Sequence, residues 1–434
     1  MKLDTLVRSA FMRVVASRPR RNYVRARARL RRRLSGGAPT VHYFHQVDDP
    51  YSHLAAQTLG SLRERYAVEF RFRLVPPPGD AYQGDVDRYP NWALDDARDI
   101  APYYGLEFPK NARLPERGQA TLANRRLAGK LDSGEFAESA TEAGTLLWTG
   151  GALKGPALAT PAEAERALAE GEQLRRRWGH YRGAMFHFEG EWYWGVDRLC
   201  RLEERLVANG LSREPGRALC VPRPAAPPTR GLGASDVLLE YFPSLRSPYT
   251  AISFRRTMQL AEGSGVRLAL KPVMPMMMRG VPAPREKGLY ILTDTKREAE
   301  AHGERFGRVV DPFGEPVRRA FSLVPWAREQ GGAAAYMQSY LDAAFADGID
   351  ITSNRGLRRV VERAGLNWQS AETELGRDGW QQELDRNLED LNEAGLWGVP
   401  SFRISGGGRT GSFSCWGQDR LWRVAAEIAG RAGQ

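Results

Sequence analysis

Two stretches of the chain share one pattern, a short apolar run followed by a helix-start signal. Residues 41–44 lead to Asp49 and a proline, and residues 237–242 lead to Ser247 and a proline. Asp49 and Ser247 are good N-cap residues, and proline suits the first helical position because its missing N–H would be unpaired there. Each stretch is therefore predicted to run from a strand through a loop into a helix.

A second apolar run follows each predicted helix, at residues 68–75 and 266–273. Strand, helix and strand in this order form a βαβ unit, whose two strands are expected to pair in parallel. The helix N-terminus then lies at the carboxyl end of the first strand. Ligands of open α/β sheets bind at that end, so Asp49 and Ser247 mark the two places to search for a site.

A long helical stretch and a hairpin complete the second pattern. Apolar positions recur at helical spacing in residues 285–303 and 315–346, and the pattern continues to residue 391. These residues predict an all-helical insertion at about 280–395. The sheet then resumes with strands at 399–404 and 412–416 around a glycine turn, and a last helix begins near Asp419.

The first pattern ends in the same way, because the chain repeats itself. A spacing of 198 residues relates the beginnings of the two copies, and a spacing of 222 relates their ends, so the second copy has 24 extra residues. A period this long indicates two related domains in tandem rather than a solenoid. The matched pairs include Tyr43 and Tyr241, Pro50 and Pro248, Tyr51 and Tyr249, Asp96 and Asp294, Gly195 and Gly417, and Asp197 and Asp419.

Four segments follow from this division of an α/β chain. Residues 1–37 are predicted to form a basic arm, flexible or helical, and residues 38–212 the N-terminal domain. Residues 213–235 contain five prolines and are predicted to be a semi-rigid linker. Residues 236–434 are predicted to form the C-terminal domain with the helical insertion.

Composition supports a soluble protein with two ordinary cores. The 434 residues are 42% hydrophobic, and no apolar run approaches the roughly 18 residues of a membrane span. The three cysteines, at positions 200, 220 and 415, are scattered and form no Cys-x-x-Cys pair. We therefore expect a reducing, cytoplasmic environment and neither a disulfide framework nor dithiol chemistry.

The net charge of +11 is located entirely in the arm. Residues 1–33 hold Lys2 and eleven arginines against Asp4 alone, which leaves 51 basic and 51 acidic residues in the rest of the chain. Such an arm is suited to an anionic partner, either RNA or a membrane surface, although basic tails are often only solvated. Arg8 and Arg13 interrupt its apolar stretch, so the arm is not predicted to be a secretory signal.

Several motifs in the second copy occur in the order of a known family. Most of residues 237–430 resemble the kappa-class glutathione transferases and 2-hydroxychromene-2-carboxylate isomerases, which have a DsbA-like thioredoxin fold. Residues 38–205 match more loosely, and Ala184-Met185 stand in place of a Val-Pro signature. The motifs are a strand ending in Tyr-Phe, Ser247-Pro248-Tyr249, Lys287 and Tyr290 at the start of the insertion, Gly398-Val399-Pro400-Ser401-Phe402, and Trp416-Gly417-Gln418-Asp419-Arg420.

The resemblance implies that Ser247 is the catalytic residue and holds the sulfur of glutathione as a thiolate. A free thiol with a pKa of about 8.5 is only about 3% ionised at neutral pH, and lowering that pKa by two units needs roughly 2.7 kcal/mol. A hydrogen bond to a charged group supplies about 1.5 to 3 kcal/mol and a helix N-terminus about 0.3 to 1 kcal/mol. Ser247 could therefore suffice, although a plain N-cap would explain its position equally well.

Further contacts to substrate or glutathione are implied for Tyr249, Arg279, Val399, Pro400, Gln418 and Asp419. A cis bond before Pro400 would turn the Val399 main chain toward the ligand, and Asp419 would meet the γ-glutamyl amine. Gln418 stands where relatives often have serine. The Met274–Arg279 stretch is shorter than in the family, and its methionines are expected to fill the core rather than line an apolar pocket.

The first copy is expected to have lost this chemistry. Asp49 takes the place of Ser247, and a carboxylate would raise the pKa of a neighbouring thiol instead of lowering it. We expect Asp49 to be a solvated helix cap. No set of His, Cys and carboxylate residues has metal-ligand spacing, so no metal is predicted.

Two hypotheses of different classes remain open. The first is a glutathione-dependent isomerase or transferase that acts on an aromatic or unsaturated small-molecule electrophile, with its site in the C-terminal domain. The second is a non-catalytic thioredoxin-fold binding or scaffold protein that uses the basic arm. A dithiol oxidoreductase is nearly excluded, because Pro248-Tyr249 occupy the place of a cysteine motif. A homo-oligomer is compatible with either hypothesis.

Overall fold

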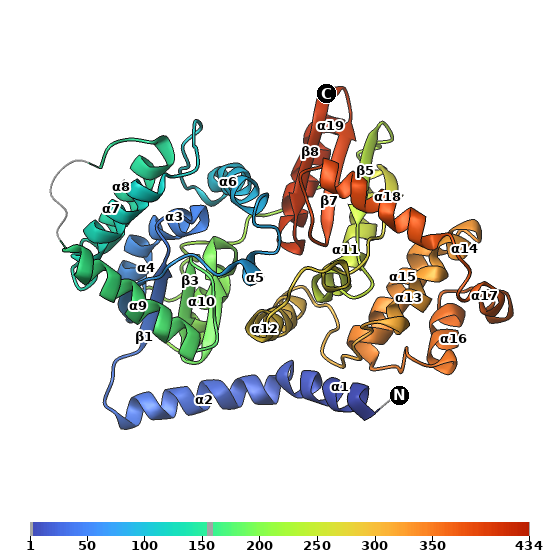
Figure 1. The fold of residues 1–434 in the computed structure, drawn as a ribbon, viewed down its shortest axis with the longest axis horizontal. Coiled ribbons are helices and arrows are strands. Elements are labelled where there is room, and N and C mark those ends of the chain that lie inside the picture. The colour runs from blue at the N-terminus through green and yellow to red at the C-terminus, as the bar shows by residue number, and fades with distance from the viewer. Residues whose placement is uncertain (1–2, 154–158, 434) are drawn as a thin grey trace. The chain divides into compact units, whose positions relative to one another are not determined.

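The computed structural model describes residues 3–153 and 159–433 and divides the chain into two compact units (Figure 1). The N-half unit comprises Asn22–Pro224 and Pro284–Lys287. The C-half unit comprises Met1–Arg21, Ala225–Ala283 and Gly288–Gln434. Each unit contains one four-stranded sheet.

The N-half unit surrounds its sheet with helices. Helix α10 packs on strands β3 and β4, α9 packs on β2, and α3 contacts both α8 and α10. The elements are α2 (Arg18–Leu34), β1 (Thr40–His45), α3 (Pro50–Ala56), α4 (Leu59–Arg65), β2 (Glu69–Leu74), α5 (Asp80–Gln83), α6 (Tyr89–Ile100), the 3₁₀ turn η1 (Ala101–Tyr104), α7 (Arg117–Ala128), α8 (Phe136–Thr149), α9 (Pro161–Arg177), β3 (Met185–Phe188), β4 (Glu191–Trp194) and α10 (Gly195–Ala208).

The C-half unit carries the predicted helical insertion between its second and third strands. Helix α19 packs on β5, β7 and β8, and α11 contacts α15 and α19. The elements are α1 (Leu3–Val15), β5 (Val237–Phe242), α11 (Pro248–Ser264), β6 (Arg267–Leu270), η2 (Met276–Arg279), α12 (Arg285–Ala301), α13 (Glu315–Ser322), α14 (Val324–Glu329), α15 (Ala333–Asp342), the π turn η3 (Ala343–Asp347), α16 (Asn354–Arg363), α17 (Trp368–Glu374), α18 (Trp380–Glu393), β7 (Ser401–Gly406), β8 (Arg409–Trp416), η4 (Gln418–Arg420) and α19 (Leu421–Ala432).

The two sheets have the same strand order and the same pairing directions. The orders are β2-β1-β3-β4 and β6-β5-β7-β8, with one parallel pair and two antiparallel pairs in each. Each thus contains the predicted βαβ unit and the closing hairpin. Strand β6 is shorter than the predicted 266–273, because Pro243 on the neighbouring segment has no N–H to donate, although Lys271 and Val273 still donate to the carbonyls of Tyr241 and Pro243.

Each unit has its own aromatic and aliphatic core. In the C-half unit, Tyr241 and Phe402 stack face to face on neighbouring strands, with ring centres 5.1 Å apart. In the N-half unit, Phe72 of β2 stacks on Phe136 of α8 at 4.3 Å. Inward-facing positions of the strands thus meet helices of the same unit, as expected for an independent core.

The proline-rich segment begins as part of the N-half unit. The buried Glu203 carboxylate accepts hydrogen bonds from the main-chain N–H groups of Cys220 and Val221, at 2.7 and 2.8 Å. Arg65 forms an ion pair with Glu214 at 2.9 Å. Residues 214–221 are therefore fixed to the unit that precedes them. Within the described residues, no helix has the length and apolar character needed to cross a bilayer.

Candidate active site

Ser247 caps helix α11 at the carboxyl end of strand β5. Its hydroxyl oxygen accepts a hydrogen bond from the N–H of Thr250 at 3.1 Å, and Pro248 occupies the first helical turn. The same hydroxyl donates to the carbonyl oxygen of Val399 at 3.5 Å, which is the limit of hydrogen-bond length. The candidate catalytic hydroxyl therefore faces the main chain of Val399.

The Val399–Pro400 peptide bond is cis, as the family resemblance implies. The carbonyl of Pro400 accepts the N–H of Gly417 at 2.8 Å, and Ser401 then begins strand β7 beside Phe242, the last residue of β5. The loop after β5 and the loop before β7 are neighbours because these strand ends are paired. Sheet topology thus brings Ser247 to a residue 152 positions away.

Two tryptophans stand directly beside this loop. The rings of Trp397 and Trp416 lie 5.1 Å apart, and a Cβ atom on Gly398 would lie only 2.1 Å from the Trp416 ring. Only glycine fits at position 398 without a shift of the ring. The loop before Val399 is therefore packed closely against the Trp416 ring, with Trp397 buried beside it.

Arg279 anchors the methionine-rich segment to the same loop. Its guanidinium donates to the carbonyl of Met274 at 3.0 Å and to the carbonyl of Trp397 at 2.7 Å. Burial lowers the pKa of Arg279 to about 10. The predicted ligand-binding arginine thus already holds two protein carbonyls beside the site.

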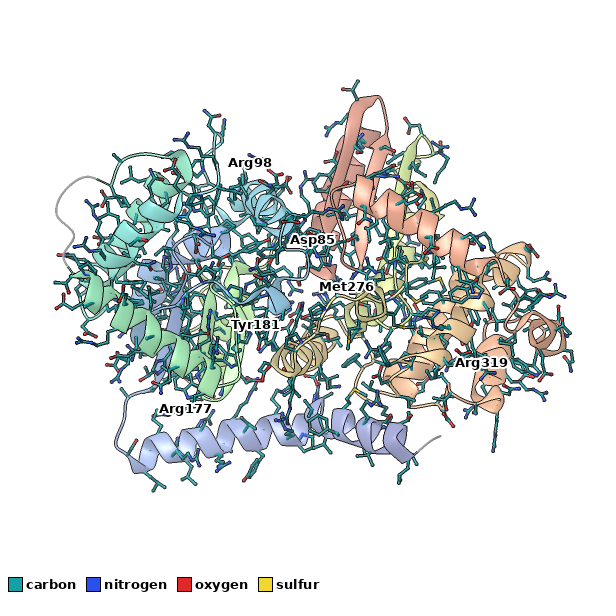
Figure 2. The ribbon with its side chains drawn as sticks, viewed as in Figure 1. Asp85, Arg98, Arg177, Tyr181, Met276 and Arg319 are labelled. Atoms are coloured by element: carbon teal, nitrogen blue, oxygen red, sulfur yellow. The ribbon has the colours of Figure 1, made fainter. Side chains whose placement is uncertain are left out.

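The methionines divide between core and surface, so the expectation of a purely core role was only partly right. Met274 and Met278 pack against the hydrophobic core. Met276 (labelled in Figure 2) is half-buried outside that core, and Met277 is exposed. The 3₁₀ turn η2 carries Met276, Met277 and Met278, and at three residues per turn it points successive side chains to different sides.

Arg246, the residue directly before the catalytic candidate Ser247, is held in place by neighbouring side chains. The sequence did not single it out. It forms a two-pronged ion pair with Asp311, at 2.7 and 3.0 Å, and its guanidinium lies 4.8 Å from the centre of the Phe313 ring. It also approaches the sulfur of Met277 at 3.2 Å. The only sequence signal was its position next to Ser247, because Asp311 is 65 residues away and lies in the insertion.

Tyr249 and Gln418 are engaged by other side chains. The Tyr249 hydroxyl donates to Asp294 at 2.8 Å. Gln418 is buried and donates to Asp419 and, at 3.4 Å, to Glu298. These two predicted ligand-binding residues therefore belong to internal polar networks, and Asp419 itself is partly exposed at the start of the last helix.

The N-half unit builds a different arrangement at the equivalent position. Asp49 caps α3 by accepting from the N–H and hydroxyl of Ser52, at 3.0 and 2.7 Å. The expectation of a solvated cap was wrong, because Asp49 is only 7% exposed. Burial raises the pKa of Asp49 to about 6, although the Ser52 bonds and the charge of Arg182 lower it.

Arg182 stands at the position that Gly398 occupies in the C-half unit. The sheet registers align Phe186 with Phe402, and therefore Ala184 with Pro400 and Arg182 with Gly398. The guanidinium of Arg182 donates to the Tyr89 hydroxyl at 2.9 Å. It lies 5.2 to 5.8 Å from the ring centres of Tyr89, Trp194 and Tyr181, the last labelled in Figure 2. Side chains of the unit itself thus occupy this region.

Ala184, and not Met185 as expected from the sequence, takes the place of Pro400 and has a left-handed backbone. Its φ is 53°, and its N–H donates to the hydroxyl of Ser52 at 2.8 Å. Its carbonyl accepts the N–H of Gly195 at 2.7 Å, as the carbonyl of Pro400 accepts the N–H of Gly417. The two units share this hydrogen bond, which closes the hairpin. They differ in the residue that faces the start of the helix.

No group of three His, Cys, Asp or Glu residues able to hold a metal ion occurs within residues 3–153 and 159–433. The cysteines at positions 200, 220 and 415 are free thiols, two of them buried. Burial, with the nearby Glu203, raises the pKa of Cys220 to about 11, which suppresses its thiolate at neutral pH. The hydroxyl of Ser247 remains the candidate for chemistry in the C-half unit.

Comparison with known proteins defines the class of the C-half fold. Residues 238–429 match the family model of the DSBA-like thioredoxin domain, so the C-terminal region has a DsbA-like thioredoxin fold. This confirms the mixed α/β fold class expected for that part of the chain. No curated protein matches the sequence.

Similar solved structures come from several proteins with low identity. A 2-hydroxychromene-2-carboxylate isomerase is 19% identical (TM-score 0.37), with 44% of this chain and 95% of that chain covered. A probable DsbA oxidoreductase from Streptomyces coelicolor is 16% identical (TM-score 0.35; 45% and 90% covered). The cytosolic disulfide reductase DsbM from Pseudomonas aeruginosa, solved with GSH, is 18% identical (TM-score 0.34; 45% and 99% covered).

Proposed function

We propose that the C-half unit is a glutathione- or thiol-dependent isomerase or transferase, of the 2-hydroxychromene-2-carboxylate isomerase or kappa-class transferase type. Its substrate would be an aromatic or unsaturated electrophile. One observation carries the proposal: the Ser247 hydroxyl, at the start of a 17-residue helix, lies 3.5 Å from the carbonyl oxygen of Val399. A helix N-terminus and a hydroxyl donor both favour an anion at that point.

The residues present fit the sulfur-bearing part of glutathione. When bound, glutathione would supply the sulfur nucleophile. The Ser247 hydroxyl would exchange its long bond to Val399 for a bond to the ionised sulfur. The Val399 main chain would pair with the cysteinyl part in the manner of an added strand, and Asp419 would hold the γ-glutamyl amine. The half-buried Trp416 ring, backed by the buried Trp397, offers an apolar surface for an aromatic substrate.

The N-half unit, in this proposal, is a degenerate copy of the same fold, so that the chain is a tandem of two DsbA-like domains. The common strand order and the shared Tyr51–Asp96 and Tyr249–Asp294 hydrogen bonds, at 2.7 and 2.8 Å, support a duplication. The buried Asp49 carboxylate would repel a thiolate. The N-half unit would therefore contribute structure or binding and no thiol activation.

Isothermal titration with reduced glutathione, combined with the ultraviolet absorbance of the bound thiolate, tests the proposal. The parent protein should bind the thiol and lower its pKa by about two units. Ser247→Ala should return that pKa most of the way to about 8.5, while Ser412→Ala, at an exposed strand position, should change nothing. Absence of binding heat in all three proteins would reject the proposal.

A second candidate is a non-catalytic binding or scaffold protein that uses its basic arm. The observation in its favour is that Arg279 and Gln418 are already bonded to protein groups. Deleting residues 1–33 is a poor test, because Val15 and Ala16 belong to the C-half core. A pull-down that compares the parent with a variant in which exposed arm arginines are substituted tests this candidate. Loss of the partner in that variant, for a protein that binds no thiol, favours the binding protein over the enzyme.

A further inference from the structure

Helix α1 has two apolar faces, and only one of them is covered. The inner face carries Ser9, Val15 and Ala16, which are buried, and Met12, which packs on the C-half core. The outer face consists entirely of exposed apolar side chains, with exposed fractions from 45% at Leu6 to 78% at Leu3 for the larger ones. Its members are Leu3, Leu6, Val7, Ala10, Phe11 and Val14.

This outer face forms one continuous stripe. At 100° per residue, its six side chains span an arc of roughly 140°. Arg8 lies at one border of the arc and Arg13 at the other, and both are exposed. A surface helix of a soluble domain normally turns polar residues outward, so an apolar stripe between two arginines indicates a missing partner.

Helix α2 has a related exposed row. Tyr23, Leu30 and Leu34 are spaced by seven and four residues, which places them along one line of the helix, and they are 57 to 79% exposed. The arginines of α2 divide by face. Arg25 and Arg32 form ion pairs with Glu191 and Glu189 of the N-half unit, at 2.6 and 2.9 Å.

The outer arginines of α2 are different. Arg27, Arg31 and Arg33 are exposed, and their side chains have no ion pair or hydrogen bond with any part of the chain that the structure describes. They lie close to the line of exposed apolar residues. Each helix, taken by itself, therefore combines apolar side chains with uncompensated positive charge.

A polar groove of about 760 Å³ adjoins the end of α1 in the C-half unit. Arg13 and Arg308 both lie close to Gly348 there. A Cβ atom on that glycine would be 2.8 Å from the Arg13 guanidinium and 3.3 Å from the Arg308 side chain. Neither arginine has a carboxylate partner within the described ranges. The groove is also lined by Glu300, Glu304 and Asp347, so only the side with the two arginines offers charge for a phosphate group.

We propose that each of these helices docks its own unit on an anionic lipid bilayer, α1 the C-half unit and the exposed row of α2 the N-half unit. Amphipathic helices that lie in the membrane interface bury an apolar stripe among the acyl chains, while arginines bind anionic headgroups. RNA would use the arginines but not an apolar stripe made mostly of Leu and Val. A second copy would bring two arms of net charge +11 together, which like-charge repulsion opposes.

Vesicle flotation of the full-length protein tests this inference. The parent should float with vesicles of phosphatidylcholine and phosphatidylglycerol and remain unbound with phosphatidylcholine alone. Val7→Ser combined with Phe11→Ser should reduce binding by about tenfold or more, because two apolar side chains no longer leave water. Arg27→Gln, Arg31→Gln and Arg33→Gln together should reduce it by a similar factor.

A matched control uses exposed apolar residues of the N-half unit. Val207→Ser combined with Leu114→Ser removes side chains of comparable exposure, 42% and 41%, and should leave flotation unchanged. In a Phe11→Trp variant, difference spectra against the parent should show a blue shift of the added indole fluorescence with anionic vesicles only. Both substituted helix faces are solvent-exposed, so folding, checked by circular dichroism, should be preserved.

Three outcomes would overturn the inference. The first is no flotation with anionic vesicles. The second is flotation that Val7→Ser with Phe11→Ser leaves intact, together with RNA binding that the arginine variant abolishes. The third is a dimer that the serine variant dissociates while vesicles remain unbound.

Discussion

At the scale of single residues, the sequence predicted which residues cap the helices, but it did not predict how buried their side chains are. Asp49 and Ser247 were assigned as N-caps from their type and the proline that follows each, and the structure has both caps. Asp49 is buried, and its pKa is influenced by the charge of Arg182, which lies more than a hundred residues away in the sequence. Proximity of that kind has no local signature in the sequence.

The Arg246–Asp311 ion pair should stabilise the loop that carries Ser247. Its side chains are 18% and 10% exposed, and its geometry is two-pronged, so solvent screens it less than a surface pair. Arg246→Gln should lower the free energy of unfolding of the C-half unit by about 1 to 2 kcal/mol. Urea unfolding of the single and double variants with Asp311→Asn measures the coupling.

The exposed pair Arg358–Glu362 on α16 is a matched control. These side chains are 53% and 47% exposed and lie one helical turn apart. The same cycle there should give a coupling below about 0.5 kcal/mol. Equal couplings at the two pairs would contradict a positioning role for Arg246.

At the scale of elements, the order of strands and helices was largely predictable from the sequence. Which apolar helix faces are covered by other parts of the fold was not. The spacing of apolar residues and the turn signals located both βαβ units and both hairpins within a few residues, because apolar spacing marks the core-facing sides of strands and helices. Strand β6 ended earlier than predicted, because Pro243 opposite it cannot donate a hydrogen bond. The exposed stripe of α1 was missed, because an apolar side chain in the sequence does not reveal whether anything covers it.

Gly398 sets how closely the loop before Pro400 approaches strand β8. Gly398→Ala would place a methyl group 2.1 Å from the Trp416 ring, so the indole or the loop must move. We expect a loss of about 1 to 3 kcal/mol in the free energy of unfolding, as for overpacked cores, and weaker thiol binding. Thermal unfolding and titration with glutathione measure both effects.

Gly263→Ala, inside helix α11, is the control for this substitution. A methyl group there meets nothing within 4 Å, and alanine favours a helix over glycine by about 1 kcal/mol. This variant should be neutral or stabilised and should bind glutathione as the parent does. A loss at Gly263 as large as at Gly398 would show that the effect is not specific to the loop.

At the scale of the whole molecule, the titratable groups are distributed unevenly. Five of the six histidines lie in the N-half unit. Burial lowers the pKa of His45 to about 3 and that of His53 to about 4, against an ordinary value of 6.5. The structure also lowers the pKa of His42, His180 and His187, mainly by burial.

The N-half unit should therefore lose stability in mild acid. Between the unfolded pKa of 6.5 and the lower folded values, the unfolded chain binds protons that the folded unit does not, so stability falls as the pH drops. Each neutral histidine contributes a slope of roughly 1.4 kcal/mol per pH unit. Asp49, with a folded pKa raised to about 6, offsets part of this loss between about pH 6 and 4.

Hydrogen exchange resolved by peptide, at pH 7 and at pH 5, measures this difference after correction for intrinsic exchange. Peptides from residues 40–208 should lose protection before those from residues 237–432. His53→Gln should reduce the acid sensitivity, because glutamine does not bind a proton in this pH range. The substitution loses no hydrogen bond at the buried Nδ1 of His53, which has no partner among the described residues. Earlier loss of protection in the C-half peptides would contradict the prediction.

The backbone at Ala184 constrains how the two halves can evolve. Proline fixes φ near −65° and has no N–H, whereas Ala184 stands at 53° and donates its N–H to Ser52. A proline at this position would break that bond and demand a rotation of the chain before any benefit could appear. New activity in the first half is therefore more readily reached by building on Asp49 and Arg182 than by installing the thiol pocket proposed for the second half.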